Sequence, residues 1–455
     1  MPTLHGILIK LRSDLGYRAN SNGGVCVLYA EKVIDAFLVG EYETVFKNRC
    51  EYIKKNYEQL PALLQRVKEE TKIKSKSKSK SKSKSKSKSK VNSSAFFPVK
   101  NAGESLSHTP LQNPITEEER QMIYEVAAFI GQGELYQNPE DYYGVFEQSF
   151  SQVQIQPISC YAQSDALERL GGRACLVSFI GVYTRPELIQ YIQQLNQLAK
   201  VSAHDFALSL GSDNHRISLC YSHAQKNWHV IDANQPDLRS LPANDVSHVE
   251  LANMLLVAFG DAHHGVCALS SQLFTTGQQQ VILQEKVNTW KQNEELIALH
   301  DITLTHATRK NARKATLAWL AAKEGDVSAL QRIAELSPMV DLNQAISNGV
   351  TPVFMAAQNG HVDVLRLLIE AKTLDGLPRV DLNQATNNGI TPLYIAAHCG
   401  RLDIVTILLE AKVNLDCLYL ELSPLQHAEM QGHAAIAALL KEALKEVRSS
   451  ELLHQ

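Results

Sequence analysis

A segment near the C-terminus occurs twice, 40 residues apart, and this repetition restricts the fold more than any other feature of the chain. Asn348-Gly-Val-Thr-Pro-Val-Phe-Met-Ala-Ala returns as Asn388-Gly-Ile-Thr-Pro-Leu-Tyr-Ile-Ala-Ala, and Val-Asp-Leu-Asn-Gln-Ala occurs both at Val340 and at Val380. In each copy Thr-Pro is typical of a helix start, and the small Ala-Ala pair permits close helix packing. A unit this short cannot bury its apolar face alone, so we expect the copies to stack into a helical solenoid.

The same pattern is present in weaker form on both sides, in residues 317–336 and 423–440. Together the copies resemble ankyrin repeats, which implies four stacked repeats over residues 313–445 and a surface that binds another protein. The spacing between the two clear copies exceeds the ankyrin unit of about 33 residues. We therefore expect an inserted loop near residues 373–379.

The resemblance also indicates where a partner protein would bind, because ankyrin stacks use the tips of their turns and the inner face of their helices. The candidate contacts at these places are Asn348, Gln358, Asn359, Asn388 and His398. The alternative for Asn348 and Asn388 is that each Asn-Gly pair serves only the geometry of a tight turn.

A second feature lies near the N-terminus, where the polar, glycine-rich residues 20–24 lead into Cys26. Apolar side chains then recur at the spacing of one buried helix face, at Val27, Ala30, Val33, Ile34, Phe37 and Leu38. Cys26 should therefore lie in the first turn of a helix, where the macrodipole and the free backbone N–H groups favour the thiolate over the thiol. The alternative is a buried structural cysteine.

The eight cysteines are widely scattered and include no Cys-x-x-Cys pair. This distribution argues against a zinc site and against a disulfide framework, and it favours a reducing compartment. We predict no metal and no cofactor. No apolar run is long enough to span a bilayer, and the N-terminus lacks the features of a signal peptide.

Lysine alternates with serine from Lys74 to Lys90, and without these nine lysines the net charge of −3 would be −12. Like charges at every second residue repel one another, and nothing in the tract can be buried. We therefore expect a disordered insertion over residues 72–113. The tract could contact acidic surfaces weakly, or it could be a tolerated expansion within a surface loop. No aromatic residue interrupts the lysines, so no specific nucleic-acid motif is present.

Residues 1–290 have the pattern of an α+β domain. The expected elements are, in order, a short strand at 6–11, helices to about residue 70, a helix at 118–132 behind a capping box of Thr116 and Glu119, a strand or buried helix at 173–183, a helix after Thr184, and antiparallel strands at 206–210, 216–222 and 227–233. We predict a helical linker at 291–312. A polar tail at 446–455 could be a secretion signal.

The last two predicted strands can close as a hairpin around residues 222–225. His215 and Asp232 would then lie opposite each other at its open end, within reach of a cross-strand hydrogen bond. Such a bond fixes the imidazole tautomer and leaves the second ring nitrogen to take a thiol proton. For a single histidine, a structural or surface role is the alternative.

Cys26 at a helix start, with His215 and Asp232-Ala-Asn on late strands, resembles the papain-like cysteine peptidases, especially the bacterial effectors of the YopT and AvrPphB type. The resemblance implies that Cys26 is the nucleophile, His215 the general base and acid, and Asp232 the residue that orients the imidazole. It also implies that Asn20 stabilises the oxyanion together with the Cys26 backbone N–H. The sequence departs from the family in having Asn20 in place of glutamine, Ala233 in place of proline, and a long insertion.

A papain-like domain followed by ankyrin repeats resembles the ankyrin-repeat effectors that intracellular bacteria deliver into host cells by type IV secretion. That resemblance implies a cysteine hydrolase, most simply a peptidase, active in the host cytoplasm or nucleus on a host protein that the repeats select. Two alternatives remain. One is a catalytically inactive scaffold whose repeats modulate a host protein, and the other is a different thiol chemistry such as deamidation or acyl transfer.

Overall fold

The computed structural model describes residues 7–8, 10–11, 25–63, 66, 115–116, 118–120, 122–123, 126, 165–244 and 247–453, the side chains of residues 25–28, 165, 235–238 and 448–453 excepted. Asn20 and the predicted insertion at residues 72–113 lie outside the described residues.

The chain first forms an N-terminal region of helices and strands. Its described elements are α2 (Val25–Leu38), the π-helix η1 (Tyr42–Phe46), α3 (Lys47–Asn56), α7 (Asp165–Arg169), β1 (Arg173–Thr184), α8 (Arg185–Val201), β2 (Phe206–Gly211), β3 (Arg216–Ser222), β4 (Asn227–Asp232), β5 (Gln235–Pro242), α9 (Ser247–Ala258), β6 (Val266–Thr276), η5 (Gly277–Gln279) and α10 (Gln280–Trp290). The elements that follow in the described part of the chain are helices: α11 (Glu294–His300), α12 (Leu304–Thr308), α13 (Leu317–Glu324), α14 (Val327–Leu336), α15 (Pro352–Asn359), α16 (Val362–Glu370), α17 (Pro392–His398), α18 (Leu402–Glu410), α19 (Pro424–Gln431) and α20 (Ala434–Leu453).

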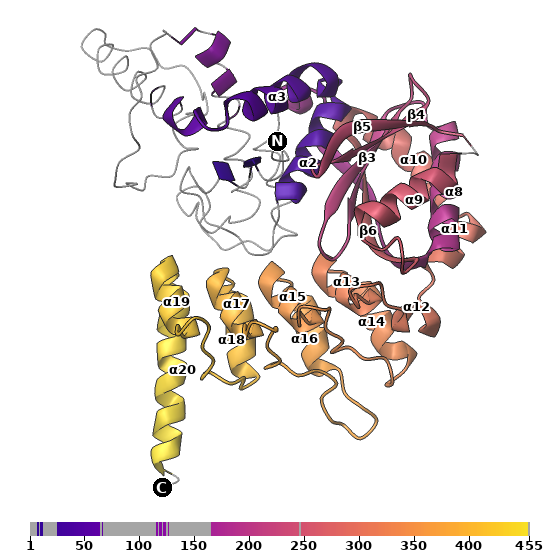
Figure 1. Ribbon diagram of the computed structural model, residues 1–455. Coiled ribbons are helices and arrows are strands. Elements are labelled where there is room, and N and C mark those ends of the chain that lie inside the picture. The colour runs from indigo at the N-terminus through magenta and orange to yellow at the C-terminus, as the bar shows by residue number, and fades with distance from the viewer. Residues whose placement is uncertain are drawn as a thin grey trace.

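The described strands form one antiparallel sheet in the order β1-β6-β2-β3-β4-β5. Helix α2 lies on one face of it, and α8 and α9 lie on the other (Figure 1). Alternation along β3 explains both contacts, because Leu219 and Tyr221 join the core with α8 and α9, whereas Cys220 joins the core with α2. The sheet is therefore buried between two helical layers.

The structure corrects the strand predicted at residues 6–11, because Ile7, Leu8, Lys10 and Leu11 are helical. Ile7, Leu8 and Leu11 are all buried. Residues 7, 8 and 11 lie on one face of a helix, so all three side chains can be buried together. In a strand, Leu8 and Leu11 would point to opposite faces.

Three of the predicted strands are present as β2, β3 and β4, and residues 173–183, which suited strand or helix, lie in strand β1. Strands β5 and β6 and helix α9 have no counterpart among the predicted elements. In β6, Ser270 and Ser271 interrupt the apolar pattern, yet both are buried. Burial is tolerated because their hydroxyls bond to Glu324 at 2.8 Å and to Tyr191 at 2.7 Å.

Helices α13 to α20 pack as successive pairs in a row that leads away from the sheet (Figure 1). The first helix of each pair begins in the same way, with a hydroxyl that accepts a hydrogen bond from the backbone N–H three residues later. These hydroxyls belong to Thr316, Thr351, Thr391 and Ser423. Helix α20 ends at Leu453, so the predicted tail at 446–455 is helical up to that residue.

The repeated Val-Asp-Leu-Asn segment connects one pair to the next. Asp341 accepts a hydrogen bond from the Asn343 backbone N–H at 2.8 Å, and the Asn343 side-chain oxygen accepts from the Asp381 backbone N–H at 3.1 Å. The same contact recurs between Asn383 and Asn414 at 2.7 Å. The segment is repeated because it joins neighbouring units.

The loop expected near residues 373–379 is a small hairpin closed by a bridge between Lys372 and Pro378. Arg379 anchors it to the preceding repeat. Its guanidinium donates to three carbonyl oxygens at 2.8–2.9 Å, those of Ala334, Ser337 and Val340.

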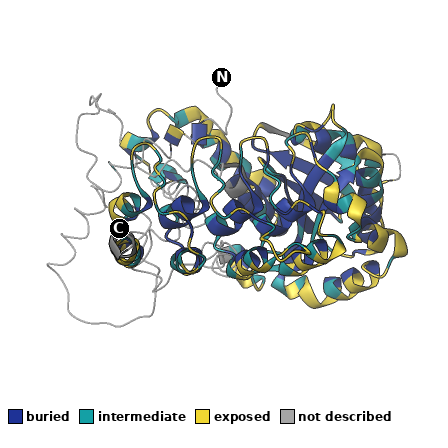
Figure 2. Cartoon of the chain, turned by 90° about the horizontal axis from the view of Figure 1, so that it is seen from below, coloured by how far each residue is buried: buried dark blue, intermediate teal, exposed yellow. Residues whose placement is uncertain are grey.

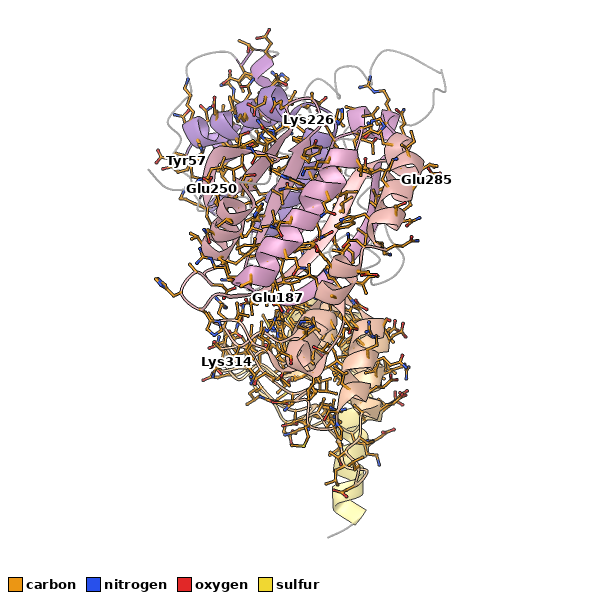
Figure 3. The ribbon with its side chains drawn as sticks, turned by 90° about the vertical axis from the view of Figure 1, so that its right-hand side faces the viewer. Tyr57, Glu187, Lys226, Glu250, Glu285 and Lys314 are labelled. Atoms are coloured by element: carbon orange, nitrogen blue, oxygen red, sulfur yellow. The ribbon has the colours of Figure 1, made fainter. Side chains whose placement is uncertain are left out.

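The segment that leads into the first repeat is bonded directly to the α+β region. Asp213 accepts a hydrogen bond from Asn311 at 2.9 Å and forms an ion pair with Arg313. Glu187 pairs with Arg309 at the start of α8, at the end of that helix nearest the repeats (Figure 3). Buried residues are found both in the sheet and on the helices of the array (Figure 2). Within the described part of the chain, no helix is long and apolar enough to cross a membrane.

Candidate functional site

Cys26 is the second residue of α2, in the first turn of the helix. The side chain of Cys26 lies outside the described part of the chain, and its backbone position is described. The first turn of α2 contains no acidic residue. No carboxylate on that turn therefore offsets the positive end of the helix dipole, which favours an ionised thiol there.

Helix α2 runs alongside β3 in a fixed register. The Ser218 hydroxyl donates to the Ala30 carbonyl oxygen at 2.8 Å. Two turns further along the helix, the Phe37 ring lies 5.8 Å from the His229 ring, centroid to centroid, and His229 pairs with Cys220 across the hairpin. The direction from Ala30 to Phe37 is therefore the direction from Ser218 to Cys220.

The start of α2 consequently lies at the end of the sheet that carries His215. Cys26 precedes Ala30 by four residues, which is a helical rise of about 6 Å. The same distance back from Ser218 covers about two strand residues and leads to Arg216, next to His215. Packing of α2 on β3 thus brings two distant parts of the sequence to one end of the sheet.

His215 and Asp232 are joined by a hydrogen bond, with His215 Nε2 donating to Asp232 Oδ1 at 2.8 Å. The hairpin register differs from the predicted one. Ser218 pairs with Ile231, so the register is shifted by two residues and Asp232 lies diagonally from His215. The turn ends one residue later than predicted, at Lys226, whose backbone is left-handed with φ 54°. A shift of two residues returns each side chain to the same face of its strand, so the bond still forms.

Both side chains of the pair are nearly buried, His215 with 6% and Asp232 with 8% of its surface exposed. Phe259 lies beside the imidazole, with 6.3 Å between ring centroids. A carboxylate on Nε2 favours the tautomer with its proton on that nitrogen. Nδ1 is then the ring atom that would exchange a proton with a thiol.

Asn234 is a further polar contact of this pair and was not among the predicted site residues. Its backbone N–H donates to Asp232 Oδ1 at 2.8 Å, and its side-chain nitrogen lies 3.4 Å from His215 Nε2. Asp232 Oδ1 thereby accepts two hydrogen bonds, which hold it toward the ring. The signal was present in the sequence, because Asp-x-Asn favours a turn in which the first side chain accepts from the backbone two residues on.

A tight turn in front of β3 fixes the backbone of His215. The Ser212 N–H donates to the His215 carbonyl oxygen at 2.8 Å, and the His215 N–H donates to the Ser212 hydroxyl at 3.2 Å. These reciprocal bonds restrict how His215 can move relative to the sheet.

Five of the described cysteines outside α2 are poor nucleophiles, because burial disfavours their thiolate forms. Burial raises the pKa of the Cys50 thiol to about 12 and raises the pKa of Cys220 and Cys267 far above the usual range. Burial also raises the pKa of Cys175 and Cys417. In the described residues, no group of three or more His, Cys, Asp or Glu side chains is arranged to hold a metal ion.

Two of the predicted partner contacts, Asn348 and Asn388, are exposed at the tips of the turns. A polar groove of about 450 Å³ lies beside Asn348, and Lys314 at its edge is labelled in Figure 3. The polar side chains that line the groove belong to Lys314, Asp341, Asn343, Gln344, Ser347, Gln384 and Asn387.

The other three predicted contacts lie between repeats. Asn359 donates to the Lys323 carbonyl oxygen of the preceding repeat at 2.8 Å. His398 Nδ1 lies 2.6 Å from His427 Nε2 of the following repeat. Gln358 is half-buried. The role of all five residues in partner binding stays a prediction.

Comparison with known protein families supports the assignment of the C-terminal region. A family model for ankyrin repeats (three copies) matches residues 318–417 and 371–451. A comparison with curated proteins finds no match. The C-terminal region, residues 318–451, therefore consists of ankyrin repeats, which are protein-binding modules.

Proposed function

We propose that the chain is a papain-like cysteine hydrolase, most simply a peptidase, in which Cys26, His215 and Asp232 act on a protein held by the ankyrin repeats. The observation that carries this proposal is the buried His215–Asp232 hydrogen bond at the end of the sheet where α2 begins. Deamidation and acyl transfer would use the same residues and the same first step.

The chemistry follows from these positions. Cys26 Sγ attacks a carbonyl carbon after its proton passes to His215 Nδ1, and Asp232 stabilises the resulting imidazolium. His215 then protonates the leaving group, and water hydrolyses the thioester. Asn20 and the Cys26 backbone N–H would donate to the oxyanion during both steps.

The repeats supply the second half of the proposal. Hydrogen-bonding groups at the exposed turn tips and in the polar groove suit an extended polypeptide, whose backbone offers donors and acceptors along its length. The combination of a thiol hydrolase with such a surface suits a bacterial effector. In this proposal, type IV secretion delivers the chain into a host cell, where it acts on a host protein in the cytoplasm or nucleus.

A reporter enzyme fused to the chain tests delivery. The reporter signal in host cells should require an intact secretion system, and an equal signal without one would contradict delivery.

Thiol labelling of the intact protein tests the catalytic half. An epoxysuccinyl peptide, a reagent for cysteine peptidases, should label Cys26 at neutral pH faster than it labels Cys399 and Cys417. His215→Ala should slow the labelling of Cys26 by about 100-fold and leave the other two rates unchanged. Mass spectrometry of the digested protein measures all three rates in one sample. Equal rates at the three cysteines would favour the inactive scaffold.

A further inference from the structure

We propose that Lys323 and Glu324, at the C-terminal end of the first ankyrin helix α13, are positioning residues for His215. The inference rests on the proposed function and deepens it, because it makes the first repeat a part of the site. It concerns residues 212–216, a segment that α13 contacts on both sides of His215.

Lys323 holds the turn that precedes His215. Its ammonium group donates to the Ser212 carbonyl oxygen. The Ser212 backbone N–H in turn donates to the His215 carbonyl oxygen at 2.8 Å, and the Ser212 hydroxyl accepts from the His215 backbone N–H at 3.2 Å. A movement of the Lys323 side chain therefore reaches His215 through consecutive hydrogen bonds.

Glu324 holds Arg216, the residue that follows His215. Arg216 Nη2 lies 3.5 Å from Glu324 Oε1, and the Ser270 hydroxyl donates to the same oxygen at 2.8 Å. Arg216 and Glu324 are each 12% exposed, so solvent screens their attraction little. Burial alone would raise the pKa of Glu324, but the charges of Arg216 and Lys323 outweigh it and lower the pKa below its usual value. The carboxylate is therefore charged at neutral pH.

Arg216 also connects Glu324 to the helix that bears Cys26. Arg216 Nη1 donates to the Ser209 hydroxyl at 2.9 Å, and Ser209 donates to Glu31 Oε1 at 2.8 Å. Glu31 belongs to α2 and is five residues beyond Cys26. A continuous series of polar contacts thus joins the first repeat to the imidazole segment and to the nucleophile helix.

The second repeat fixes the end of α13. Asn359 Nδ2 and His361 Nε2 both donate to the Lys323 carbonyl oxygen, at 2.8 and 2.9 Å. Gly325 follows in a left-handed conformation with φ 77°. Lys323 and Glu324 therefore project from a backbone that two repeats hold in place, which is the kind of support that a precisely oriented functional side chain requires.

Variants of the full-length protein test this inference. Lys323→Gln and Glu324→Gln should each slow Cys26 labelling by about 3- to 30-fold. Lys323→Arg and Glu324→Asp should restore most of the rate, because they keep the charge. Glu335→Gln changes an exposed glutamate of the same repeat and should leave the rate unaltered. Melting temperatures are measured for all variants, and labelling is carried out well below the lowest of them, so that every rate refers to folded protein.

A second readout does not depend on catalysis. In the Cys26→Ala protein, nitrogen NMR signals of the His215 ring report which nitrogen carries the proton. We expect the proton on Nε2, and a mixture of tautomers after Lys323→Gln or Glu324→Gln. Unchanged ring signals in both variants would overturn the inference. If wild-type labelling proves independent of His215, the proposed function fails, and the ring signals alone then decide whether Lys323 and Glu324 position the imidazole.

Discussion

Asp261 is a buried carboxyl group between the α+β region and the first repeat, with 1% of its surface exposed. It accepts hydrogen bonds from the Ala312 backbone N–H at 3.2 Å and from the Asn311 side chain at 3.4 Å. Burial raises the pKa of Asp261 to about 6, and the nearby Asp213 carboxylate adds to this effect, although both hydrogen bonds act in the opposite direction. Ionisation of Asp261 therefore opposes folding.

The consequence is a pH-dependent loss of stability. The folded-state pKa exceeds the value of about 3.9 for an unfolded aspartate, so the contribution of the bound proton is complete below pH 4 and is lost as the pH rises through about 6. Asp261→Asn removes this loss, and we expect its melting temperature to exceed that of the wild type by about 1–3 °C at pH 7.5 and by a smaller amount at pH 5, where only part of the loss has occurred. Asp375→Asn, at an exposed loop position, is the control. The same difference at both pH values would contradict this assignment.

Single residues of the site were predictable to the extent that their signals are local. Cys26 is followed by a helical apolar pattern, and His215 and Asp232 flank a hairpin with strand alternation. Lys323 and Glu324 could not be predicted, because their contacts with the segment around His215 span 111 and 108 residues. Those contacts arise only when the first repeat docks on the sheet.

Among the elements, helices α13 and α19 end at glycines with nearly the same backbone conformation, φ 77° at Gly325 and φ 80° at Gly432. A Cβ atom at Gly325 would lie 2.7 Å from the His361 ring, whereas nothing lies within 4 Å of one at Gly432. The two positions therefore separate the cost of a left-handed backbone from the cost of a close contact.

Alanine substitution at both glycines measures these costs. Gly432→Ala should lower the free energy of unfolding by about 1 kcal/mol, the cost of a left-handed alanine. Gly325→Ala should lower it by at least about 2 kcal/mol, because His361 must also move away from its hydrogen bond with the Lys323 carbonyl oxygen. Denaturant unfolding of the two full-length variants checks the difference. Equal losses would mean that the Gly325–His361 contact adds nothing.

Element types were easier to predict than their pairing. Alternation located β3 and β4, but the register depended on the left-handed residue Lys226 at the end of the turn, which no apolar pattern reports. Strand β6 was missed because Ser270 and Ser271 are polar in sequence and buried in the fold. The register of the hairpin depends on turn geometry, and the burial of the two serines depends on tertiary hydrogen bonds. Neither can be predicted from the local pattern of apolar residues.

At the scale of the whole molecule, the α+β region and the ankyrin array lie against each other (Figure 1). Partly buried polar contacts join them. The array was predictable because each copy repeats the same helix caps and turns. Its docking was not, since Asp213 and Asn311 belong to no repeated pattern. His215 lies next to these contacts. In the proposed function, binding of a partner protein to the repeats could therefore affect the catalytic histidine.

In the proposed mechanism, Cys26 and His215 form one thiolate–imidazolium pair supported by Asp232. The most direct test is the pH dependence of Cys26 alkylation by iodoacetamide, followed by peptide mass spectrometry. We expect a high rate already at pH 6, far below the pKa of about 8.5 for a free cysteine. His215→Ala should move the profile to near that value, and Asp232→Asn should lower the rate at pH 6. Asp205→Asn, the same change at the turn end of the hairpin, should have no effect. A wild-type rate that rises only near pH 8.5 and does not respond to His215→Ala would contradict the thiolate–imidazolium pair.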